Sequence, residues 1–335
     1  TAHTNSPFLP TPARDGLGPT TGERMAIYAH EAPSLALRAS KRAIEEAHFT
    51  PESITHLVTV SCTGFAAPGV DFALIRGLGL RPTVARTHVG FMGCHGALNG
   101  LRAADAFTRA DPSARVLVCA VELCSLHYYY GNAADKLIAN AIFADGAAAV
   151  VGGDSSSVAL HPPGPLRGPG GAPSSVALHP PGPLRGPGGD GSRPTHWTVA
   201  ASGSCLIPDS AADMAWTVGD RGFEMTLSRR VPALIAAHLR PWLDAWLRDN
   251  GLSLAQVRSW AVHPGGPKIV SAVEETLGLS AADLAPTREV FAGFGNMSSP
   301  TVLFILQRLR EADAPRPCVA LGFGPGLVAE AALFV

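Results

Sequence analysis

The chain of 335 residues is long enough for one large domain or two fused domains, and 46% of its residues are apolar, which supports a sizeable core. Its net charge of −1 and the lack of long basic or acidic runs exclude nucleic acid and anionic membranes as expected partners. No apolar run approaches the roughly 20 residues of a membrane span, and residues 1–19 lack the apolar core of a signal peptide. The six cysteines form no C-x-x-C pair, so we expect buried thiols, no zinc site and a cytoplasmic location.

The hydrophobic pattern alternates between helices and strands in the first half of the chain. It predicts a helix over 34–48, with Ser34 as its N-cap, and the following apolar run 54–62 is typical of a buried strand. The same alternation then predicts, in chain order, a helix over 94–109, a strand over 115–123, a helix over 132–141 and a strand over 146–151.

A second set of elements follows after residue 194. It begins with a strand over 195–202 and a long amphipathic helix over 226–248 that we expect to bend at Pro241. The remaining predicted elements are a strand over 259–263, helices over 267–278 and 299–311, and two strands over 319–323 and 327–335. Two similar αβ halves around a common core therefore account for the pattern.

A proline- and glycine-rich insert separates the two halves. The run SSVALHPPGPLRGPGG occurs at 156–171 and again, letter for letter, at 174–189. This composition disfavours a packed helix or strand, so we interpret the insert as a duplicated surface loop, with a proline-rich recognition segment as the alternative. The expected organisation is an N-terminal half over 1–152, the insert over 153–194 and a C-terminal half over 195–335.

Cys94 is the first candidate functional residue. It lies in the run GFMGCHGA (90–97), between the apolar stretch 84–89 and a helical pattern, which places a thiol where a strand meets a helix N-terminus. Free N–H groups and the helix dipole favour an anion there, and the thiolate is the nucleophilic form of cysteine. Lowering a thiol pKa by about two units requires roughly 2.7 kcal/mol, whereas a helix N-terminus supplies at most about 2 kcal/mol. We therefore expect a second group, most simply an imidazolium, beside the sulfur.

Two further motifs supply partners for the thiol. AVHPGGPK (261–268) puts His263 at a strand end before a Pro-Gly-Gly turn, and GFGNMSSP (293–300) puts Asn296 just before a helix. Each has a structural alternative, since a histidine at a strand end is usually a hydrogen-bonded structural residue and Asn296 is a possible helix N-cap. Together, a nucleophile, an imidazole and a carboxamide donor are the groups that acyl transfer through a thioester requires.

These residues resemble the type III polyketide synthases, the chalcone and stilbene synthase group, and most closely their bacterial-type members. The resemblance rests on the runs GCHGA, HPGGP, GNMSS and GFGPG in this order, with FADGAA (143–148) as a fifth match. It implies an α/β thiolase-like fold, in which two αβ halves form a layered α-β-α-β-α core. It also implies a homodimer that needs no cofactor and uses coenzyme A thioesters as substrates.

The resemblance assigns catalytic roles to Cys94, His263 and Asn296, with Phe143 as an aromatic gate. Cys94 would take a starter acyl group from its coenzyme A thioester. Malonyl-coenzyme A would then lose carbon dioxide, its enolate held by His263 and Asn296, and the resulting carbanion would extend the chain by two carbons. Cyclisation would give a pyrone, resorcinol or chalcone-like product.

The resemblance also indicates residues that bind substrate. The expected cavity-lining residues are Cys62, Cys124, His127, Trp216, Met225 and Ser298. His127 and Trp216 are larger than their counterparts in plant chalcone synthases, which predicts a smaller or redirected cavity. Ala67 stands where plant members carry a methionine that reaches across the dimer. The chain also begins after the segment whose basic residues hold the coenzyme A phosphates, so Gly265, Gly266 and Lys268 become the candidate coenzyme A contacts.

Two other functions fit parts of the pattern. A ketoacyl-acyl-carrier-protein synthase III-like enzyme would share the fold and the three catalytic residue types, but would extend the chain once and use a carrier protein. A catalytically silent scaffold would use the proline-rich insert to bind a partner.

Overall fold

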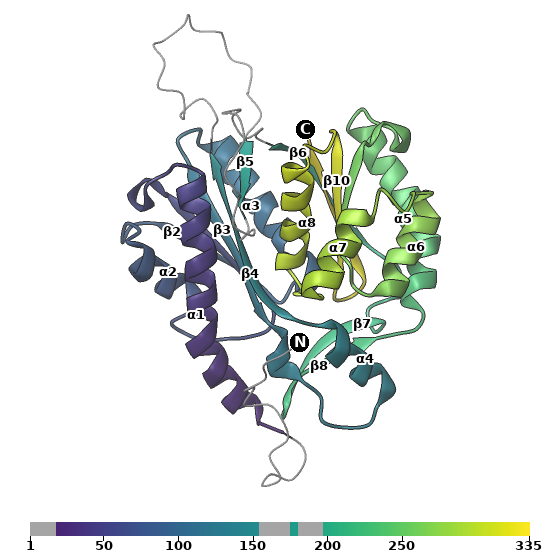
Figure 1. Ribbon diagram of the computed structural model, residues 1–335, viewed down its shortest axis with the longest axis horizontal. Helices are drawn as coiled ribbons and strands as arrows, with labels where there is room; N and C mark the ends of the chain where they lie inside the picture. The colour runs from purple at the N-terminus through teal and green to yellow at the C-terminus, as the bar shows by residue number, and fades with distance from the viewer. Residues whose placement is uncertain (1–17, 154–174, 180–196) are drawn as a thin grey trace, which may run out of the picture.

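The computed structural model describes residues 18–153, 175–179 and 197–335 (Figure 1). Nine strands follow one another in the order β2-β1-β3-β4-β5-β6-β11-β10-β9. Their bounds are β1 His56–Ser61, β2 Ala85–Gly90, β3 Arg115–Leu123, β4 Asp145–Gly153, β5 Ser175–His179, β6 Trp197–Leu206, β9 Ser259–Val262, β10 Cys318–Gly324 and β11 Val328–Phe334. A separate antiparallel hairpin consists of β7 Met214–Gly219 and β8 Gly222–Leu227.

Each half of the strand order combines parallel and antiparallel pairs. In the N-terminal half β1 lies between β2 and β3 and is parallel to both, while β4 is antiparallel to β3. In the C-terminal half β9 and β10 are parallel, and β11 is antiparallel to both β10 and β6. The short strand β5 pairs antiparallel with β4 and β6 and so connects the two halves.

Eight α-helices are described along these strands. They are α1 Thr21–Glu46, α2 Val70–Leu78, α3 Gly96–Ala110, α4 Ala134–Ile142, α5 Val231–Asp249, α6 Pro267–Leu277, α7 Ala285–Phe294 and α8 Pro300–Glu311. Figure 1 shows α1 on one side of the molecule and α5 with α6 on the other, with α3 and α8 between them.

Alternating side chains of the strands bury both faces. In β3, Val116 and Val118 pack with α3 and α8, whereas Leu117 and Cys119 point to the opposite face and pack with α1. This alternation is the period-2 pattern of a strand. A strand that is apolar on both faces needs helices packed on each face.

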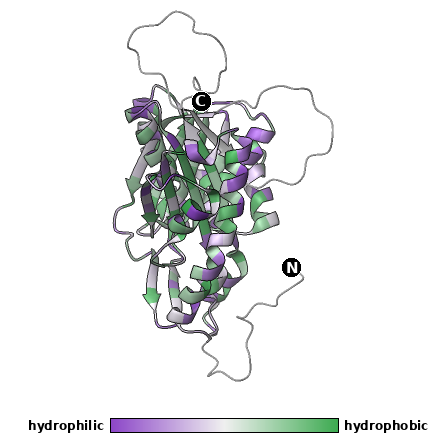
Figure 2. Ribbon diagram, turned by 90° about the vertical axis from the view of Figure 1, so that its left-hand side faces the viewer, coloured by the Kyte–Doolittle hydropathy of each residue, from purple (hydrophilic) through white to green (hydrophobic). Residues whose placement is uncertain are grey.

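The C-terminal half repeats this arrangement. Ala320 of β10 joins the same central cluster as α3 and α8, whereas Val319 and Leu321 pack with α5 and α6. The described residues therefore stack as α-β-α-β-α layers, with apolar strands in the interior and polar residues on the outer helices (Figure 2). The expected α/β class and two-half layering are confirmed.

The start of the first helix was predicted wrongly. Helix α1 begins at Thr21, 13 residues before Ser34, and its N-cap is Thr20 in a capping box with Glu23. Pro33 lies inside the helix, and the Ser34 hydroxyl donates to the Glu31 carbonyl oxygen at 3.0 Å rather than capping a terminus. Pro33 does not end the helix, because it removes only one hydrogen bond from a helix held by its buried face.

Two other predictions also need correction. Residues 226–230 are not helical, because they end the β7–β8 hairpin and lead into α5, which starts at Val231. The insert does contain a strand, β5, within the second copy of its repeat. The sequence analysis missed this strand because the β-forming run Ser-Val-Ala-Leu-His is only five residues long and is surrounded by proline and glycine. The remaining residues of the insert, 154–174 and 180–194, lie outside the described part of the chain, so its loop and recognition interpretations stay predictions.

Candidate active site

Cys94 lies where the sequence pattern predicted, between strand β2 and helix α3. A single 3-10 turn, η2 (Gly93–His95), carries it directly onto the N-terminus of α3. Gly93 has φ +67°, and a Cβ atom there would lie 2.5 Å from Cδ of Pro325 in the turn after β10. Any larger residue would therefore separate the two halves next to the nucleophile.

Asn296 is held by backbone bonds that also hold Phe143. The Asn296 N–H donates to the Ile142 carbonyl oxygen at 2.8 Å, and the Ala144 N–H donates to the Asn296 carbonyl oxygen at 2.8 Å. The helix cap of α8 is Ser299, so the N-cap alternative for Asn296 is wrong. Its carboxamide instead lies 4.0 Å from the sulfur of Cys94. The structure thus brings together the predicted nucleophile, the amide donor and the backbone of the aromatic gate.

His263 follows the end of β9 and is fully buried. Its backbone N–H donates to the Leu321 carbonyl oxygen at 2.8 Å, but neither ring nitrogen has a hydrogen-bond partner among the described residues. The thiol of Cys94 and the ring of His263 therefore share no hydrogen bond in this structure. Burial lowers the pKa of His263 to about 3, with the charge of His95 as a smaller cause.

Burial also acts against the thiolate. It raises the pKa of Cys94 from 9.0 to about 11, and the Ser298 hydroxyl and the Asn296 amide offset this only in part. Opposing a rise of about two pKa units needs about 2.7 kcal/mol, which is more than the roughly 2 kcal/mol that a helix N-terminus contributes at most. The helix alone therefore does not ionise the sulfur, as the sequence argument anticipated.

Glu122 is the main residue near the site that the sequence analysis missed. Its fully buried carboxylate accepts hydrogen bonds from the backbone N–H groups of Cys62 at 2.9 Å and Thr63 at 3.1 Å. It also accepts from the hydroxyls of Thr63 at 2.7 Å and Ser299 at 2.6 Å. Burial raises its pKa, and these donors partly offset the rise. An acidic residue inside the apolar run VLVCAVEL was the available signal.

Two of the six predicted cavity residues lie beside the nucleophile. The Cys62 sulfur is 3.3 Å from the Ser298 hydroxyl, and Ser298 has the uncommon positive φ of +58° for a residue other than glycine. Burial raises the pKa of Cys62 well above its usual value, so this second thiol is neutral.

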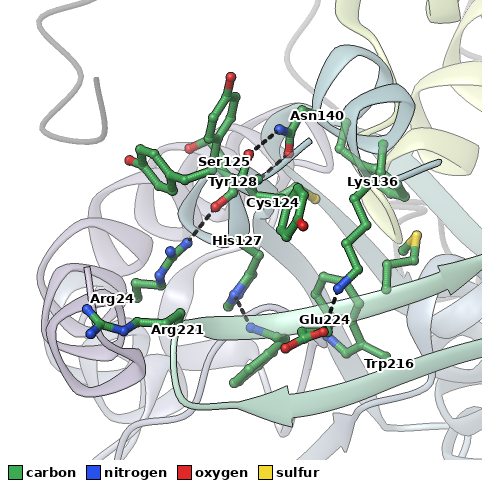
Figure 3. A pocket seen from close by; sticks show the side chains of 17 residues that line it. Arg24, Cys124, Ser125, His127, Tyr128, Lys136, Asn140, Trp216, Arg221 and Glu224 are labelled. Atoms are coloured by element: carbon green, nitrogen blue, oxygen red, sulfur yellow. Dashed lines mark hydrogen bonds and ion pairs between the residues drawn. The ribbon is translucent and has the colours of Figure 1, made fainter. Parts of the chain in front are cut away.

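The other four predicted cavity residues, together with Phe143, line a pocket of about 290 Å³ (Figure 3). They are Cys124, His127, Trp216 and Met225. The pocket also has lining residues that the sequence analysis missed, notably Phe223 and the ion pair between Lys136 and Glu224, whose Nζ and Oε2 atoms are 2.6 Å apart. These lie on α4 and on the unpredicted β7–β8 hairpin.

His127, Trp216 and Phe223 form a cluster that we call the aromatic wall. The His127 ring stacks on Phe223 with centroids 4.3 Å apart and meets Trp216 edge-on at 5.2 Å. The Trp216 indole N–H donates to the Cys62 carbonyl oxygen at 2.7 Å. This bond ties the aromatic wall to Cys62, which lies close to Cys94 through Ser298.

Two backbone bonds define the tautomer of His127. The Phe223 N–H donates to Nδ1 at 2.8 Å, so the hydrogen is on Nε2, which donates to the Thr63 carbonyl oxygen at 2.7 Å. Burial lowers the pKa of His127 to about 4, which agrees with a neutral ring. Protonation would turn Nδ1 into a donor facing another donor.

The buried residue Arg24 supports the loop that carries His127. Its Nη1 donates to the carbonyl oxygens of Leu126 and, at 3.1 Å, Tyr128, while its Nε donates to Pro19 at 2.9 Å. Burial lowers the pKa of Arg24, and three carbonyl oxygens accept hydrogen bonds from its Nε and Nη1 atoms.

The candidate coenzyme A residues lie at the start of α6. Gly266 is the N-cap of this helix, and the Gly265 N–H donates to the carbonyl oxygen of His263 at 3.0 Å. Lys268 is exposed in the first turn. They are therefore connected to the site through His263 but do not line the pocket described above.

Among the described residues, no group of three or more His, Cys, Asp or Glu side chains is arranged to hold a metal ion. All six cysteines are free thiols. None of the described helices is long and apolar enough to cross a membrane.

Two αβ halves that place a thiol at a helix N-terminus beside a carboxamide define a condensing acyltransferase of the thiolase-like fold. Comparisons with known proteins agree with this class. The models of the N-terminal and C-terminal domains of chalcone and stilbene synthases match residues 12–155 and 198–335. The chain therefore belongs to this family and is a type III polyketide synthase, which favours the main prediction over the ketoacyl synthase alternative.

Individual relatives are similar over nearly the whole chain. The alpha-pyrone synthesis polyketide synthase-like Pks18 of Mycobacterium tuberculosis is 33% identical over 319 residues, covering 94% of this chain and 73% of the relative. The crystal structure of PKS-I from the brown alga Ectocarpus siliculosus has a TM-score of 0.83 at 30% identity and covers 99% and 82% of the two chains. That of 1,3,6,8-tetrahydroxynaphthalene synthase from Streptomyces coelicolor has a TM-score of 0.77 at 28% identity, with coverage of 94% and 81%.

The tautomer of His127 generates a prediction on pH. The ring has a pKa of about 4 in the folded protein and about 6.5 when unfolded, so the unfolded chain binds more protons between these values. Its contribution to stability is complete above pH 6.5 and is lost as the pH falls towards 4. His127→Gln should lower the slope of the free energy of unfolding against pH by up to about 1.4 kcal/mol per pH unit.

Urea unfolding at several pH values between 7.5 and 4.5 measures this slope. His30→Gln is the matched control, because the His30 side chain is 84% exposed. If His127→Gln and the wild type show the same slope, the hydrogen-bond pattern around the ring is wrong.

Proposed function

We propose that Cys94 is the nucleophile that accepts the starter acyl group from a coenzyme A thioester. The observation that carries this proposal is the sulfur at the N-terminus of α3, 4.0 Å from the carboxamide of Asn296. The thiolate attacks the thioester carbonyl, the coenzyme A thiolate leaves, and the acyl group remains on Cys94 as a new thioester.

His263 takes the proton of Cys94 in this proposal. Burial disfavours the thiolate and the imidazolium separately, but a proton moved between them creates two opposite charges side by side, whose attraction offsets both penalties. A small movement of either side chain is needed for this transfer, since catalytic hydrogen bonds often tighten only when substrate binds.

The extension step begins with malonyl-coenzyme A. Loss of carbon dioxide leaves its electron pair on the α-carbon, as an enolate whose oxygen accepts N–H bonds from Asn296 and from the His263 ring. The apolar face of Phe143, whose backbone is tied to Asn296, disfavours the carboxylate before it leaves. The α-carbon then attacks the acyl thioester and releases Cys94 as thiolate. Decarboxylation itself supplies the carbon nucleophile, so we propose that no cofactor takes part.

The size of the pocket supports a short product. Its volume of about 290 Å³ lies at the lower end of small-molecule sites, and the aromatic wall closes one side. Pks18 is described as an alpha-pyrone synthesis enzyme. We propose a pyrone over a resorcinol or chalcone-like ring. An enol oxygen of the short chain attacks its own thioester carbonyl, the C–S bond breaks, and the thiolate leaves and takes up the enol proton.

Gly265, Gly266 and Lys268 are proposed to receive the coenzyme A part of the substrates. The positive end of the α6 dipole and the exposed ammonium group of Lys268 favour an anion. Lys268→Ala should raise KM for malonyl-coenzyme A more than it lowers kcat, because the contact is the same in ground and transition states.

We also propose a cytoplasmic homodimer. Large apolar side chains are exposed near the site, with Phe65 67%, Phe91 48% and Met92 46% accessible, and such a patch is typical of a protein interface. The six free thiols suit a reducing compartment. Sedimentation should give twice the chain mass of 34.7 kDa, whereas a monomer at micromolar concentration would contradict the dimer.

Replacement of the nucleophile separates the two half-reactions. Cys94→Ala should form no acyl adduct and lower condensation by at least about a thousandfold, yet still release carbon dioxide from malonyl-coenzyme A, since His263 and Asn296 remain. Intact-protein mass spectrometry measures the acyl adduct, and carbon dioxide release with malonyl-coenzyme A alone measures decarboxylation. Cys205→Ala, a part-exposed cysteine outside the site, is the control. An acyl adduct that still forms in Cys94→Ala would contradict the role of Cys94 as the nucleophile.

The aromatic wall generates a second prediction. Trp216→Ala removes a lining ring that is bonded to Cys62 and so enlarges the pocket, and the products should therefore gain at least one two-carbon unit. Trp242→Ala on helix α5, where Trp242 stacks on Trp246 away from the pocket, is the control. The measurement is the mass of the products after incubation with a panel of starter thioesters. Identical masses in both variants would show that the wall does not set chain length.

A further inference from the structure

His95 follows the nucleophile and points into the C-terminal half. Only 3% of its surface is exposed. Two glycines of β10 make room for it, because a Cβ on Gly324 would lie 2.4 Å from its ring atoms Cδ2 and Nε2, and one on Gly322 would lie 3.1 Å from its Cβ. The ring therefore packs directly on the backbone of β10.

Strand register puts His95 beside His263. Val262 of β9 is paired with Leu321 of β10, and both side chains point to the α5–α6 side. The next residues along these parallel strands, His263 and Gly322, consequently share the opposite face, which α3 covers. Since His95 lies over Gly322 on that face, the two imidazole rings are neighbours.

Hydrogen bonds leave one nitrogen of His95 free to accept. Its Nδ1 lies 2.8 Å from Oδ1 of Asn99, so the hydrogen is on Nδ1 and the lone pair of the neutral ring is on Nε2. This Nε2 and both ring nitrogens of His263 have no hydrogen-bond partner among the described residues. Buried polar atoms are almost always paired, so three unpaired imidazole nitrogens side by side need an explanation.

We propose that His95 is a positioning residue that accepts a hydrogen bond from His263, directly or through one water molecule. This bond places the hydrogen of neutral His263 on the nitrogen that faces His95 and turns the lone pair of the other nitrogen towards Cys94. When His263 takes the thiol proton, it donates to the thiolate on one side and to His95 on the other. The order is then Asn99, His95, His263, Cys94, with each group orienting the next. The inference rests on the proposed roles of Cys94 and His263.

The arrangement requires His95 to stay neutral, and the groups around it favour this state. Glu330 of β11 lies opposite Gly322 and attracts a proton to His95, but it already accepts from Arg102 of α3 and from the Ser204 hydroxyl at 2.7 Å. Burial lowers the pKa of His95, the charge of Glu330 raises it and that of Arg102 lowers it. A charged His95 would also repel a charge on His263.

The test is the pH dependence of iodoacetamide alkylation at Cys94, followed by peptide mass spectrometry in the full-length protein. Alkylation of the part-exposed Cys205 in the same samples is the internal control. His95→Phe keeps a ring but removes the acceptor, so the rate at pH 7 should fall about tenfold, in line with a lost hydrogen bond to a charged group. In His95→Gln the amide oxygen occupies the place of Nε2, and the rate should fall less than threefold.

Two further variants make every outcome decisive. A shift in His263→Ala without a shift in His95→Phe overturns the role of His95 and leaves the proposed function standing. An unchanged profile in His263→Ala overturns the Cys94–His263 pairing itself. If His95→Phe does not fold, Asn99→Leu leaves the ring in place and frees its tautomer, so a rate equal to that of the wild type in this variant rejects the proposal.

Discussion

The site depends on a half-buried thiol and a fully buried imidazole, in surroundings that favour the neutral form of each. The protein interior disfavours either charge alone, since it raises the pKa of Cys94 to about 11 and lowers that of His263 to about 3. A charged pair is accessible only when both groups ionise together, by transfer of one proton. In the proposed mechanism the resting enzyme thereby keeps Cys94 protected, and reactivity is confined to the geometry in which sulfur and imidazole meet.

The central helical layer makes this geometry possible. Helix α3 begins just after Cys94 and helix α8 begins four residues after Asn296, so the positive ends of both helix dipoles lie close to these two residues in sequence, where the proposed mechanism forms anions. Glu122 links the end of β1 to the start of α8 through Cys62, Thr63 and Ser299. A buried carboxylate with several donors costs less than an unpaired one and fixes the relative position of the two halves.

Local patterns made much of the fold and the position of Cys94 in it predictable. Strand β3 was predicted with its observed bounds because both of its faces are apolar, and Cys94 was placed at a strand–helix junction because Gly93 and the helical pattern are adjacent in sequence. Elements whose sequence pattern is weaker than that of a neighbouring element were missed or misplaced. Examples are the first turns of α1, which precede Pro33, and the β7–β8 hairpin, which precedes α5. The first helix was predicted too short, whereas the helical pattern of α5 was extended over the end of the hairpin.

The parts of the site that escaped prediction depend on contacts between distant residues. Ser299 donates to Glu122 from 177 residues away, and Trp216 bonds to Cys62 from 154 residues away, so no window of sequence contains either pair. The size of His127 and Trp216 suggested a smaller cavity. Only the fold shows that these two rings contact each other and Phe223, and so form one rigid wall. A side chain bonded at both ring nitrogens cannot swing aside for a longer chain without breaking two backbone bonds. Cavity size in this enzyme is therefore set by hydrogen bonds to the wall as much as by the volume of the side chains that compose it.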